Sequence, residues 1–291
     1  MKRLIVLGST GMLGSEIVRV ASEANVPLIE VSRSKGILFD AEKTTFSSLA
    51  KELTLSENDW LVNCIGWIPQ KATGETQKDE EQAWTLNALL PAQISDSKKH
   101  FGFGWIQIGT DCVFSGATGS YSESSPFDAS DLYGTSKIEG EKMSEGDIRI
   151  RCSVIGRDKQ SSSGLYEWFR SQSNSETVNG FTNHIWNGVS TTAFARLVVG
   201  LFQAGEKETF THHWIPLGVV SKYELLRIFA KKLELQVSIR AFETEQYIDR
   251  TLITSDTERN LRLWRLADYE EIPSIEALCQ EFISRDKKLG L

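Results

Sequence analysis

Cysteine is scarce in this sequence, and the spacing of its few cysteines excludes the usual cysteine-based sites. Only four occur among 291 residues, and the nearest two, Cys112 and Cys152, are 40 positions apart. Without a C-x-x-C pair there is no sign of a zinc knuckle or of a thioredoxin-type motif. Cys64, Cys112 and Cys152 lie in apolar, strand-like segments, so we expect buried thiols in a reducing compartment.

Long apolar segments are also missing. Met1 and the four residues Leu4–Leu7 are the only apolar residues before the first glycine, whereas a secretory signal needs about 7–15 in a row. No stretch approaches the roughly 20 apolar residues that span a bilayer. The sequence therefore predicts a cytoplasmic chain that does not bind a membrane.

Positive charge is in deficit, with 32 Lys and Arg against 39 Asp and Glu and a net charge of −7. Binding to nucleic acid requires clustered cations, so this class of partner is not expected. A few local cations would still be enough for a small anionic ligand. A chain of this length can also bury a sizeable core.

Histidine is rare too, and its positions give no metal site. Only four occur, and the adjacent His212 and His213 would face opposite sides of a strand. No carboxylate lies near them at the spacing of a metal ligand. We therefore expect no metal ion in this protein.

The first 155 residues do contain a regular alternation of short apolar runs and amphipathic segments. Runs such as Arg3–Leu7 are typical of strands buried on both faces, and segments such as Ser15–Ala24 have helical spacing. The expected strands are 3–7, 27–32, 60–65, 104–108 and 148–155, and the expected helices are 15–24, 47–55, 82–99 and 133–143. Strands that alternate with helices form parallel βαβ units, so we expect an α/β fold with a Rossmann-type doubly wound parallel sheet.

The pattern changes after residue 156. Two polar segments, DKQSSSG and SQSNSETVNGF, separate aromatic-rich ones, and helices are expected at 191–202, 221–233 and 275–286. We expect residues 1–156 to form the sheet domain and residues 157–291 to form a smaller α+β lobe. Some segments of the lobe, such as 188–204, can pack back on the first domain.

A glycine-rich loop follows the first expected strand directly. Gly8, Gly11 and Gly14 give the spacing G-x-x-G-x-x-G just before a helix. Gly8 would allow a sharp turn, Gly11 the approach of a phosphate and Gly14 tight helix packing, while the helix N-terminus faces a diphosphate. The G-K-[ST] ending of a P-loop is absent, which argues against an NTPase. The loop therefore predicts that residues 1–156 bind a dinucleotide, NAD(P).

The end of the second expected strand favours NADP(H) over NAD(H). NAD-preferring sheets carry an acidic residue about 20 residues after the loop, where it accepts a hydrogen bond from the ribose. Here the strand ends in Ser32, Arg33 and Ser34, and Glu30 lies two residues too early. Arg33 could clamp a 2′-phosphate by bidentate hydrogen bonds, and the serines could add donors; a solvated surface arginine is the alternative.

Tyr133 and Lys137 stand four positions apart at the start of an expected helix, which places a phenol and an ammonium on one face. An adjacent Lys⁺ stabilises a phenolate and lowers the pKa of the tyrosine, which suits acid–base chemistry. Thr110 follows the strand 104–108 at the edge where open α/β sheets bind ligands, so its hydroxyl could bind the same substrate oxygen. The alternatives are a backbone cap for Thr110 and a turn residue for Asp111.

Four motifs carry a resemblance to a known family. GSTGMLG (8–14), GTDCVFSG (109–116), YGTSKIEGE (133–141) and IRCSVIG (150–156) occur in an order and at separations that resemble the extended short-chain dehydrogenase/reductases. The second and third motifs most resemble the dTDP-4-dehydrorhamnose reductase branch, which reduces a 4-keto nucleotide sugar with NAD(P)H. Beyond residue 156 the resemblance is looser and depends on segments 181–195 and 220–233.

The resemblance implies functional residues position by position. Thr110, Tyr133 and Lys137 would be the catalytic triad, residues 63–67 would line the cofactor, and residues 152–154 would pass the nicotinamide. The expected cofactor contacts are Gly8, Thr10, Gly11, Met12, Leu13, Gly14, Ser32, Arg33, Ser34, Asp40, Cys64, Ile65, Gly66, Lys137 and Cys152. The expected substrate contacts, partly in a polar and aromatic loop at 181–188, are Asp111, Val113, Phe114, Asn183, Trp186 and Asn187.

Two further residues have competing interpretations, and two segments depart from the family pattern. Trp168 could stack on a base or pack in the core, and Arg151, inside a strand, is expected to form a structural ion pair rather than a phosphate clamp. Cys112 stands where the rhamnose reductases usually carry tyrosine, and segment 66–71 replaces their stretch A-A-x-T-x-V-D-x-A-E. Both departures indicate a different sugar.

We therefore expect an NADP(H)-dependent reductase of a 4-keto (6-deoxy) nucleotide sugar, a monomer or homodimer, that serves cell-surface polysaccharide precursor synthesis; NAD(H) stays open as its cofactor. One alternative is an NAD-dependent nucleotide-sugar epimerase or dehydratase, against which Ser32, Arg33 and Cys112 argue. The other is a non-catalytic regulatory subunit resembling the β subunit of methionine adenosyltransferase. The intact set of catalytic residues argues against that second alternative.

Overall fold

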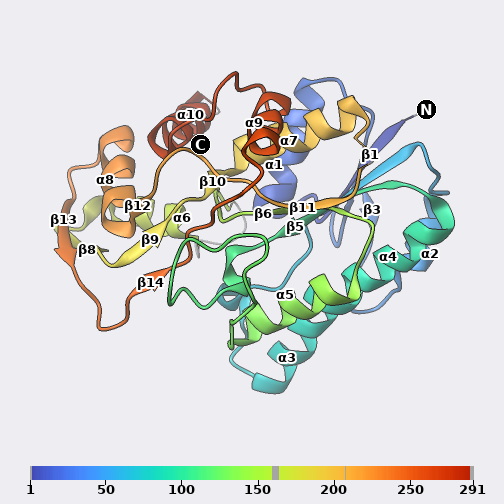
Figure 1. Cartoon of the computed structure of the whole chain (residues 1–291), viewed down its shortest axis with the longest axis horizontal. Helices are drawn as coiled ribbons and strands as arrows, with labels where there is room; N and C mark the ends of the chain where they lie inside the picture. The colour runs from blue at the N-terminus through green and yellow to red at the C-terminus, as the bar shows by residue number, and fades with distance from the viewer. Residues whose placement is uncertain (1, 159–163, 207, 289–291) are drawn as a thin grey trace.

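The computed structural model describes residues 2–158, 164–206 and 208–288, and a seven-stranded sheet lies at its centre (Figure 1). The strand order is β11-β6-β5-β4-β1-β2-β3, and every neighbouring pair is parallel. The expected Rossmann-type doubly wound parallel sheet is confirmed. The strands are β1 (Arg3–Leu7), β2 (Leu28–Ser32), β3 (Ile37–Leu38), β4 (Asp59–Asn63), β5 (Gly104–Gly109), β6 (Ile148–Arg151) and β11 (Phe210–His213).

Helices cover both faces of the sheet, and each face has its own core (Figure 1). Along β1, Leu4 and Val6 are buried against one group of helices, and Ile5 and Leu7 against the other. All four side chains are fully buried, so each contributes about 1.5–3 kcal/mol to folding. The first group is α1 (Met12–Glu23), α7 (Thr191–Ala204) and α9 (Thr257–Leu266), and the second is α2 (Phe46–Glu52), α4 (Leu90–Phe101) and α5 (Leu132–Met143).

Three segments of the C-terminal half, β11, α7 and α9, belong to the sheet layers. β11 is the edge strand and pairs with β6, from Phe210 opposite Ile148 to His213 opposite Arg151. α7, within the range expected to pack back, lies along α1 with nearly all of its side chains buried. The boundary at residue 156 stays a prediction, and the described residues after it contribute to both the sheet layers and the lobe.

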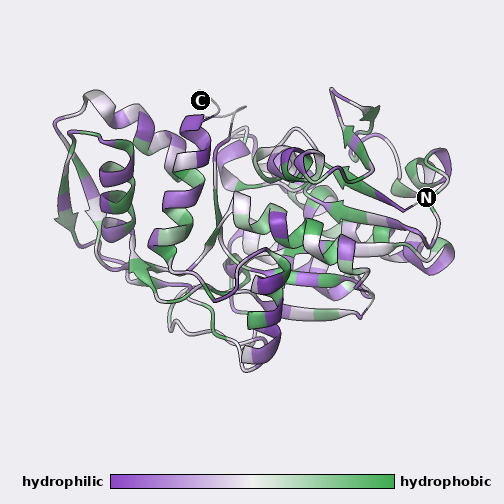
Figure 2. Cartoon of the chain, turned by 90° about the horizontal axis from the view of Figure 1, so that it is seen from above, coloured by the Kyte–Doolittle hydropathy of each residue, from purple (hydrophilic) through white to green (hydrophobic). Residues whose placement is uncertain are grey.

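The other C-terminal segments form a smaller lobe with its own aromatic core, in which Tyr166, Phe169 and Phe229 pack together. Seen from above, hydrophilic and hydrophobic residues alternate along the outer helices, as expected when one face of each packs inward (Figure 2). No helix within the described ranges is long and apolar enough to cross a bilayer. The lobe contains α6 (Leu165–Ser171), β8 (Thr177–Phe181), β9 (His184–Trp186), β12 (Val220–Ser221), α8 (Lys222–Leu233), β13 (Ser238–Phe242), β14 (Ile248–Asp249) and α10 (Ile275–Lys288).

Local structure departs from the sequence predictions where the chain changes direction. The strand expected over 148–155 is interrupted after β6, and β7 (Val154–Ile155) leaves the sheet to pair with β10 (Val189–Ser190). The helix expected over 82–99 is longer, because α3 (Thr76–Trp84), a π-helical turn (Thr85–Leu89) and α4 follow without a break. The short strands β3 and β11 and the polar helix α9 were not expected, since such elements carry little periodic signal.

Candidate active site

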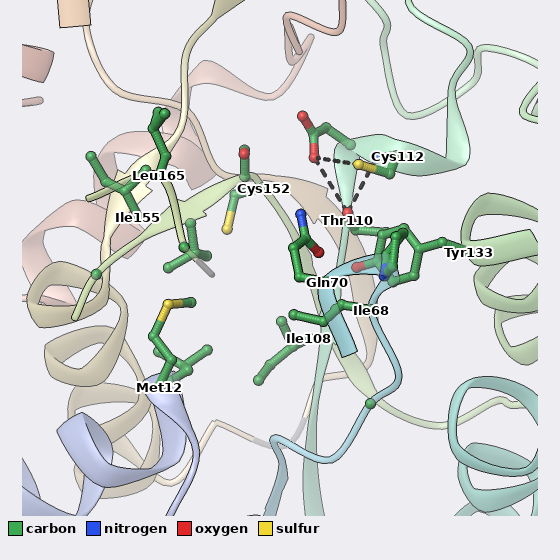
Figure 3. A pocket seen from close by; sticks show the side chains of 18 of the residues that line it. Met12, Ile68, Gln70, Ile108, Thr110, Cys112, Tyr133, Cys152, Ile155 and Leu165 are labelled. Carbon is green, nitrogen blue, oxygen red and sulfur yellow. Dashed lines mark hydrogen bonds between the residues drawn. The ribbon is translucent and has the colours of Figure 1, made fainter. Parts of the chain in front are cut away.

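A cavity of about 580 Å³ opens at the carboxyl ends of the central strands, between the sheet and the lobe (Figure 3). In doubly wound sheets this is where ligands bind. The cavity brings together residues expected to bind the cofactor and residues expected to catalyse. Those expected residues that line it are Gly11, Met12, Leu13, Asn63, Cys64, Ile65, Gly66, Thr110, Asp111, Tyr133, Lys137, Cys152, Ser153, Val154 and Trp186.

The glycine loop at one end of the cavity is shaped for a phosphate. Gly8 has a φ of +77°, in the left-handed region that favours glycine, and a Cβ on Gly14 would lie 2.1 Å from the Gly8 carbonyl oxygen. α1 begins at Met12 with Gly11 as its N-cap, and no side chain caps its first turn. The free N–H groups carry the positive end of the helix dipole, so the diphosphate of a dinucleotide fits there. Gly8 and Gly14 shape the loop from behind and do not line the cavity.

The residues expected at the ribose lie outside the cavity lining. The Ser32 hydroxyl accepts from the N–H groups of Ser34 (3.2 Å) and Lys35 (2.8 Å), so it braces its own turn. The Arg33 side chain is 74% exposed and lies 4.0 Å from Glu42. Arg33 is therefore free to turn toward a ligand at this edge, whereas the Ser32 hydroxyl is already engaged.

Asp40 and Thr10 also lie outside the lining. The Asp40 carboxylate accepts from the Glu42 N–H (3.1 Å) and pairs with Lys43 (3.1 Å). Although partial burial opposes it, this pairing holds the pKa of Asp40 below its ordinary value. Thr10 is partly exposed in the glycine loop. In this structure Asp40 thus organises the turn after β3 and does not face the cavity.

Three cysteines line the cavity, and none is arranged as a nucleophile. Burial raises the pKa of the Cys64, Cys112 and Cys152 thiols, that of Cys112 to about 12. All three are therefore protonated at neutral pH, and they give the cavity small apolar walls.

The turn after β5 places Thr110 at the edge of the cavity. The chain enters a short 3-10 turn, Asp111–Val113, whose first free N–H, that of Cys112, donates to the Thr110 hydroxyl at 3.1 Å. The same hydroxyl lies 3.3 Å from an Asp111 carboxylate oxygen. Thr110 therefore caps the turn and faces the cavity at once.

α5 presents Tyr133 and Lys137 to the same wall of the cavity, one turn apart. Asp131 caps the helix by accepting from the Gly134 N–H at 3.0 Å. The Lys137 Nζ lies 6.0 Å from the centroid of the Tyr133 ring. Across the described ranges, the Lys137 ammonium makes no hydrogen bond or ion pair with another residue.

Burial decides the protonation of this pair. It raises the pKa of Tyr133 above its ordinary value and lowers the pKa of Lys137 to about 8, with Glu141 opposing the second shift. The expected lowering of the Tyr133 pKa is absent, because a buried phenolate is penalised more than a lysine whose own charge is disfavoured can offset. Tyr133 is thereby held as a neutral acid, the form that can protonate an alkoxide.

Val113 and Phe114, expected as substrate contacts, are fully buried core residues. Phe114 stacks on Tyr121 with ring centroids 4.3 Å apart, and both belong to a cluster with Ile138. Neither lines the cavity. Both side chains pack in the core on which the turn with Asp111 rests.

Asn183 and Asn187 use both ends of their amides on the backbone of segment 244–252. Asn183 donates to the Thr244 carbonyl (2.7 Å) and accepts from the Thr244 N–H (3.1 Å). Asn187 donates to the Leu252 carbonyl (2.7 Å) and accepts from its N–H (3.0 Å). Neither amide lines the cavity, and together they hold the segment that carries Arg250.

Trp186 does line the cavity, and its indole N–H donates to the Ser153 hydroxyl at 2.8 Å. This bond fixes the ring against the segment that links β6 to β7. Trp168, the other aromatic candidate, is 38% exposed and lies outside the lining.

Sequence reasoning missed two cations that the lobe places in the cavity, Lys222 and Arg250. The Lys222 Nζ lies 5.6 Å from the centroid of the Trp186 ring, and no described residue forms a hydrogen bond or ion pair with it. Arg250 donates from Nε to the Phe114 carbonyl at 2.9 Å. Burial raises the pKa of Asp111, and these two cations oppose that shift. No local motif marks either cation, because each reaches the site only through the fold of the lobe.

Glu141 lies one turn beyond Lys137 on α5 and belongs to a cluster of buried charged residues that are paired with one another. Arg151 donates to Glu141 at 2.5 Å, and its other guanidinium nitrogen lies 2.5 Å from the His213 Nε2. Burial and Arg151 lower the pKa of His213 to about 4, so the neutral ring accepts from the guanidinium. Arg149 pairs with Asp147 at 2.9 Å in the same region. The expected structural ion pair of Arg151 is confirmed.

The family model described as the RmlD substrate binding domain matches residues 1–277. The chain belongs to this family. It is a family of NAD(P)H-dependent nucleotide-sugar reductases, and the resemblance inferred from the motifs is confirmed.

Relatives of this chain are distant. The spore coat polysaccharide biosynthesis protein SpsK of Bacillus subtilis (strain 168) is 23% identical over 86% of this chain and 86% of its own. The dTDP-4-keto-6-deoxy-D-glucose reductase of Streptomyces niveus is 24% identical over 78% and 77%. The structure of dTDP-4-dehydrorhamnose reductase from Bacillus anthracis str. Ames in complex with NADP matches with a TM-score of 0.80 at 17% identity, over 98% of this chain and 99% of that one. Solved structures that share the fold include complexes with NADP and with NAD.

Proposed function

We propose that this RmlD-family protein is an NADP(H)-dependent reductase of a 4-keto (6-deoxy) nucleotide sugar, acting in the cytoplasm in the synthesis of cell-surface polysaccharide precursors. The observation that carries the proposal is one cavity that joins an uncapped helix N-terminus to Thr110, Tyr133 and Lys137. Such a cavity holds a dinucleotide at one end and an acid–base group at the other.

The catalytic residues have complementary tasks. The Thr110 hydroxyl, fixed by the Cys112 N–H, orients the substrate carbonyl oxygen toward Tyr133. Tyr133 is protonated at neutral pH and gives its phenolic proton to that oxygen as negative charge develops there, because an alkoxide is a stronger base than a phenolate. Lys137, positively charged below about pH 8, then stabilises the phenolate that remains.

The cofactor end of the cavity suits NADP(H). The Gly11–Leu13 turn would bind the diphosphate by backbone N–H groups, and Arg33 at the exposed edge would bind a 2′-phosphate. Glu30, the nearest acidic side chain on β2, is paired with Lys35 at 3.0 Å. When bound, the cofactor supplies the hydride that reduces the keto carbon.

The lobe end of the cavity suits an anionic nucleotide sugar. Lys222 and Arg250 supply positive charge where the chain is acidic overall, and Trp186 offers an aromatic face. Lys222 is half-buried and interacts with Asp111 only beyond ion-pair distance, so a diphosphate can supply the direct ionic partner that its ammonium lacks.

The proposal is tested by NADPH oxidation against a panel of 4-keto sugars linked to dTDP, GDP and UDP. We expect oxidation with at least one member, and a slower rate when NADH replaces NADPH. Failure with every member, together with a stoichiometric protein partner in pull-down experiments, would instead support a regulatory subunit.

A further inference from the structure

The segment after β4 holds a polar side chain over the catalytic residues. Trp67 anchors this segment through its backbone. Its backbone N–H donates to the Asn87 side-chain oxygen (3.0 Å), and its backbone carbonyl accepts from the Asn87 side-chain amide (3.1 Å). Pro69 then starts a 3-10 turn, Pro69–Lys71, closed by the Lys71 N–H donating to the Ile68 carbonyl at 2.9 Å. The base of the segment is therefore fixed, and its tip stands at the mouth of the cavity.

Gln70 lies at this tip, and its side chain points into the cavity on the side of Thr110 and Tyr133 (Figure 3). Within the part of the chain that the structure describes, the Gln70 carboxamide makes no hydrogen bond. One donor group and one acceptor oxygen are thus free in the cavity. The charged groups Lys222 and Arg250 come from the opposite, lobe side.

In the proposed reaction Thr110 and Tyr133 bind the carbonyl oxygen of the substrate. A side chain beside them would therefore contact a substituent on a ring carbon next to the carbonyl carbon. A hydroxyl both donates and accepts, as a carboxamide does, so the two form a matched pair. We infer that Gln70 determines specificity by binding a hydroxyl on the ring carbon next to the reacting carbonyl, an inference that rests on the proposed reductase function.

The inference predicts a substrate class. A keto sugar with a hydroxyl on the adjacent carbon gives the carboxamide a hydrogen-bond partner in place of water, because Gln70 is exposed in the free protein, whereas the deoxygenated analogue offers it no partner. Sites built to bind a hydroxyl reject the analogue that lacks it. For one neutral hydrogen bond we expect kcat/KM to be about tenfold higher for the hydroxylated substrate.

The test compares two 4-keto nucleotide sugars that differ only in that hydroxyl, using the full chain and NADPH. In wild type, kcat/KM should favour the hydroxylated sugar about tenfold. In Gln70→Leu the value for the hydroxylated sugar should fall to that of the deoxy sugar, which itself stays unchanged. Gln77→Leu is the matched control, because Gln77 is exposed like Gln70 but lies on α3 outside the cavity lining, where its side chain bonds only to Glu81.

Two results overturn the inference while leaving the reductase function intact. One is equal loss on both sugars in Gln70→Leu, which would mean a general effect on the site. The other is an unchanged preference in that variant, which would mean that another group reads the hydroxyl. Wild-type protein that reduces neither sugar, nor any member of the keto-sugar panel, would overturn the proposed function itself.

Discussion

Two sets of charges differ in how they are paired: one is a buried set around Glu141 on α5, and the other is two half-buried lysines, Lys137 on α5 and Lys222 on α8. Glu141 is bonded to Arg151, which in turn bonds His213, so each group in that set has a partner. One turn earlier, Lys137 faces the cavity, and Lys222 faces it from the lobe. Neither lysine has a hydrogen bond or ion pair with any residue for which the structure gives a position.

The difference separates structural charges from functional ones. Removing one member of a buried ion pair leaves the other charge poorly compensated, which costs about 3–5 kcal/mol, so the members of the Glu141 set depend on one another for stability. A half-buried lysine without a direct ion pair is costly in the free protein, and such groups are typical of sites where a ligand supplies the partner. The two sets should therefore respond to mutation in different measurements.

The largest loss of activity should follow a change of Tyr133, which lines the cavity beside Lys137. In Tyr133→Phe we expect kcat to fall about 10²–10⁴-fold, because the proton donor is lost. NADPH affinity, measured by fluorescence titration, should change little, since the phenol oxygen is not needed to bind the dinucleotide. Tyr247→Phe, which removes an exposed hydroxyl at the lobe, is the control. Retention of most of the activity in Tyr133→Phe would mean that another group donates the proton.

The next effect belongs to the paired set and appears in stability. Arg151→Ala should lower the free energy of unfolding by about 3–5 kcal/mol in denaturant titrations, because Glu141 loses its nearest partner and keeps only Arg149, at 3.7 Å. Lys142→Ala, on the same helix with an exposed 3.7 Å pair to Glu139, should change it by less than about 0.5 kcal/mol. Similar values for the two variants would remove the distinction between the sets.

Lys222→Met should affect substrate binding rather than stability, the opposite of what we expect for Arg151→Ala. The KM for the nucleotide sugar should rise about 10–100-fold, the range for a lost charged hydrogen bond, while the free energy of unfolding stays level or increases. Lys231→Met, on the exposed side of the same helix, serves as the control. A loss of stability as large as that of Arg151→Ala would place Lys222 among the structural charges.

The smallest effect is expected at Arg33, a charge that is exposed and only loosely paired. Arg33→Ala should raise the apparent KM for NADPH about tenfold or less and leave that for NADH unchanged, because only NADPH carries the 2′-phosphate. Lys43→Ala controls for a general loss of positive charge at this edge. Equal changes for both cofactors would contradict the assigned role of Arg33.

The sequence was most informative where one short segment contains a whole site. The glycine loop and the Tyr133–Lys137 pair are local, so their spacing alone predicted a dinucleotide end and a catalytic wall, and both line one cavity. The alternation of strands and helices likewise predicted the parallel sheet, because that signal repeats along the chain.

It was least informative where a site is assembled from distant segments. Asn183 and Asn187 had the right chemistry for a sugar, but the fold uses their amides to brace segment 244–252. Lys222 and Arg250 gave no local signal, since only the packing of α8 and β14 beside the sheet brings them to Asp111. Burial also reversed the expected shift of the Tyr133 pKa, which depends on the whole surroundings of the phenol.

The central claim is that the protein transfers a hydride from NADPH to a 4-keto nucleotide sugar, and following that hydride with an isotope tests it most directly. The measurement uses NADPH deuterated at the transferring carbon of the nicotinamide, mixed with protein and a 4-keto nucleotide sugar, and the product is analysed by mass spectrometry. The account predicts one deuterium on the former carbonyl carbon, with consumption of one NADPH for each sugar reduced. A sugar that changes configuration without gaining deuterium, or one that stays unchanged, would contradict it.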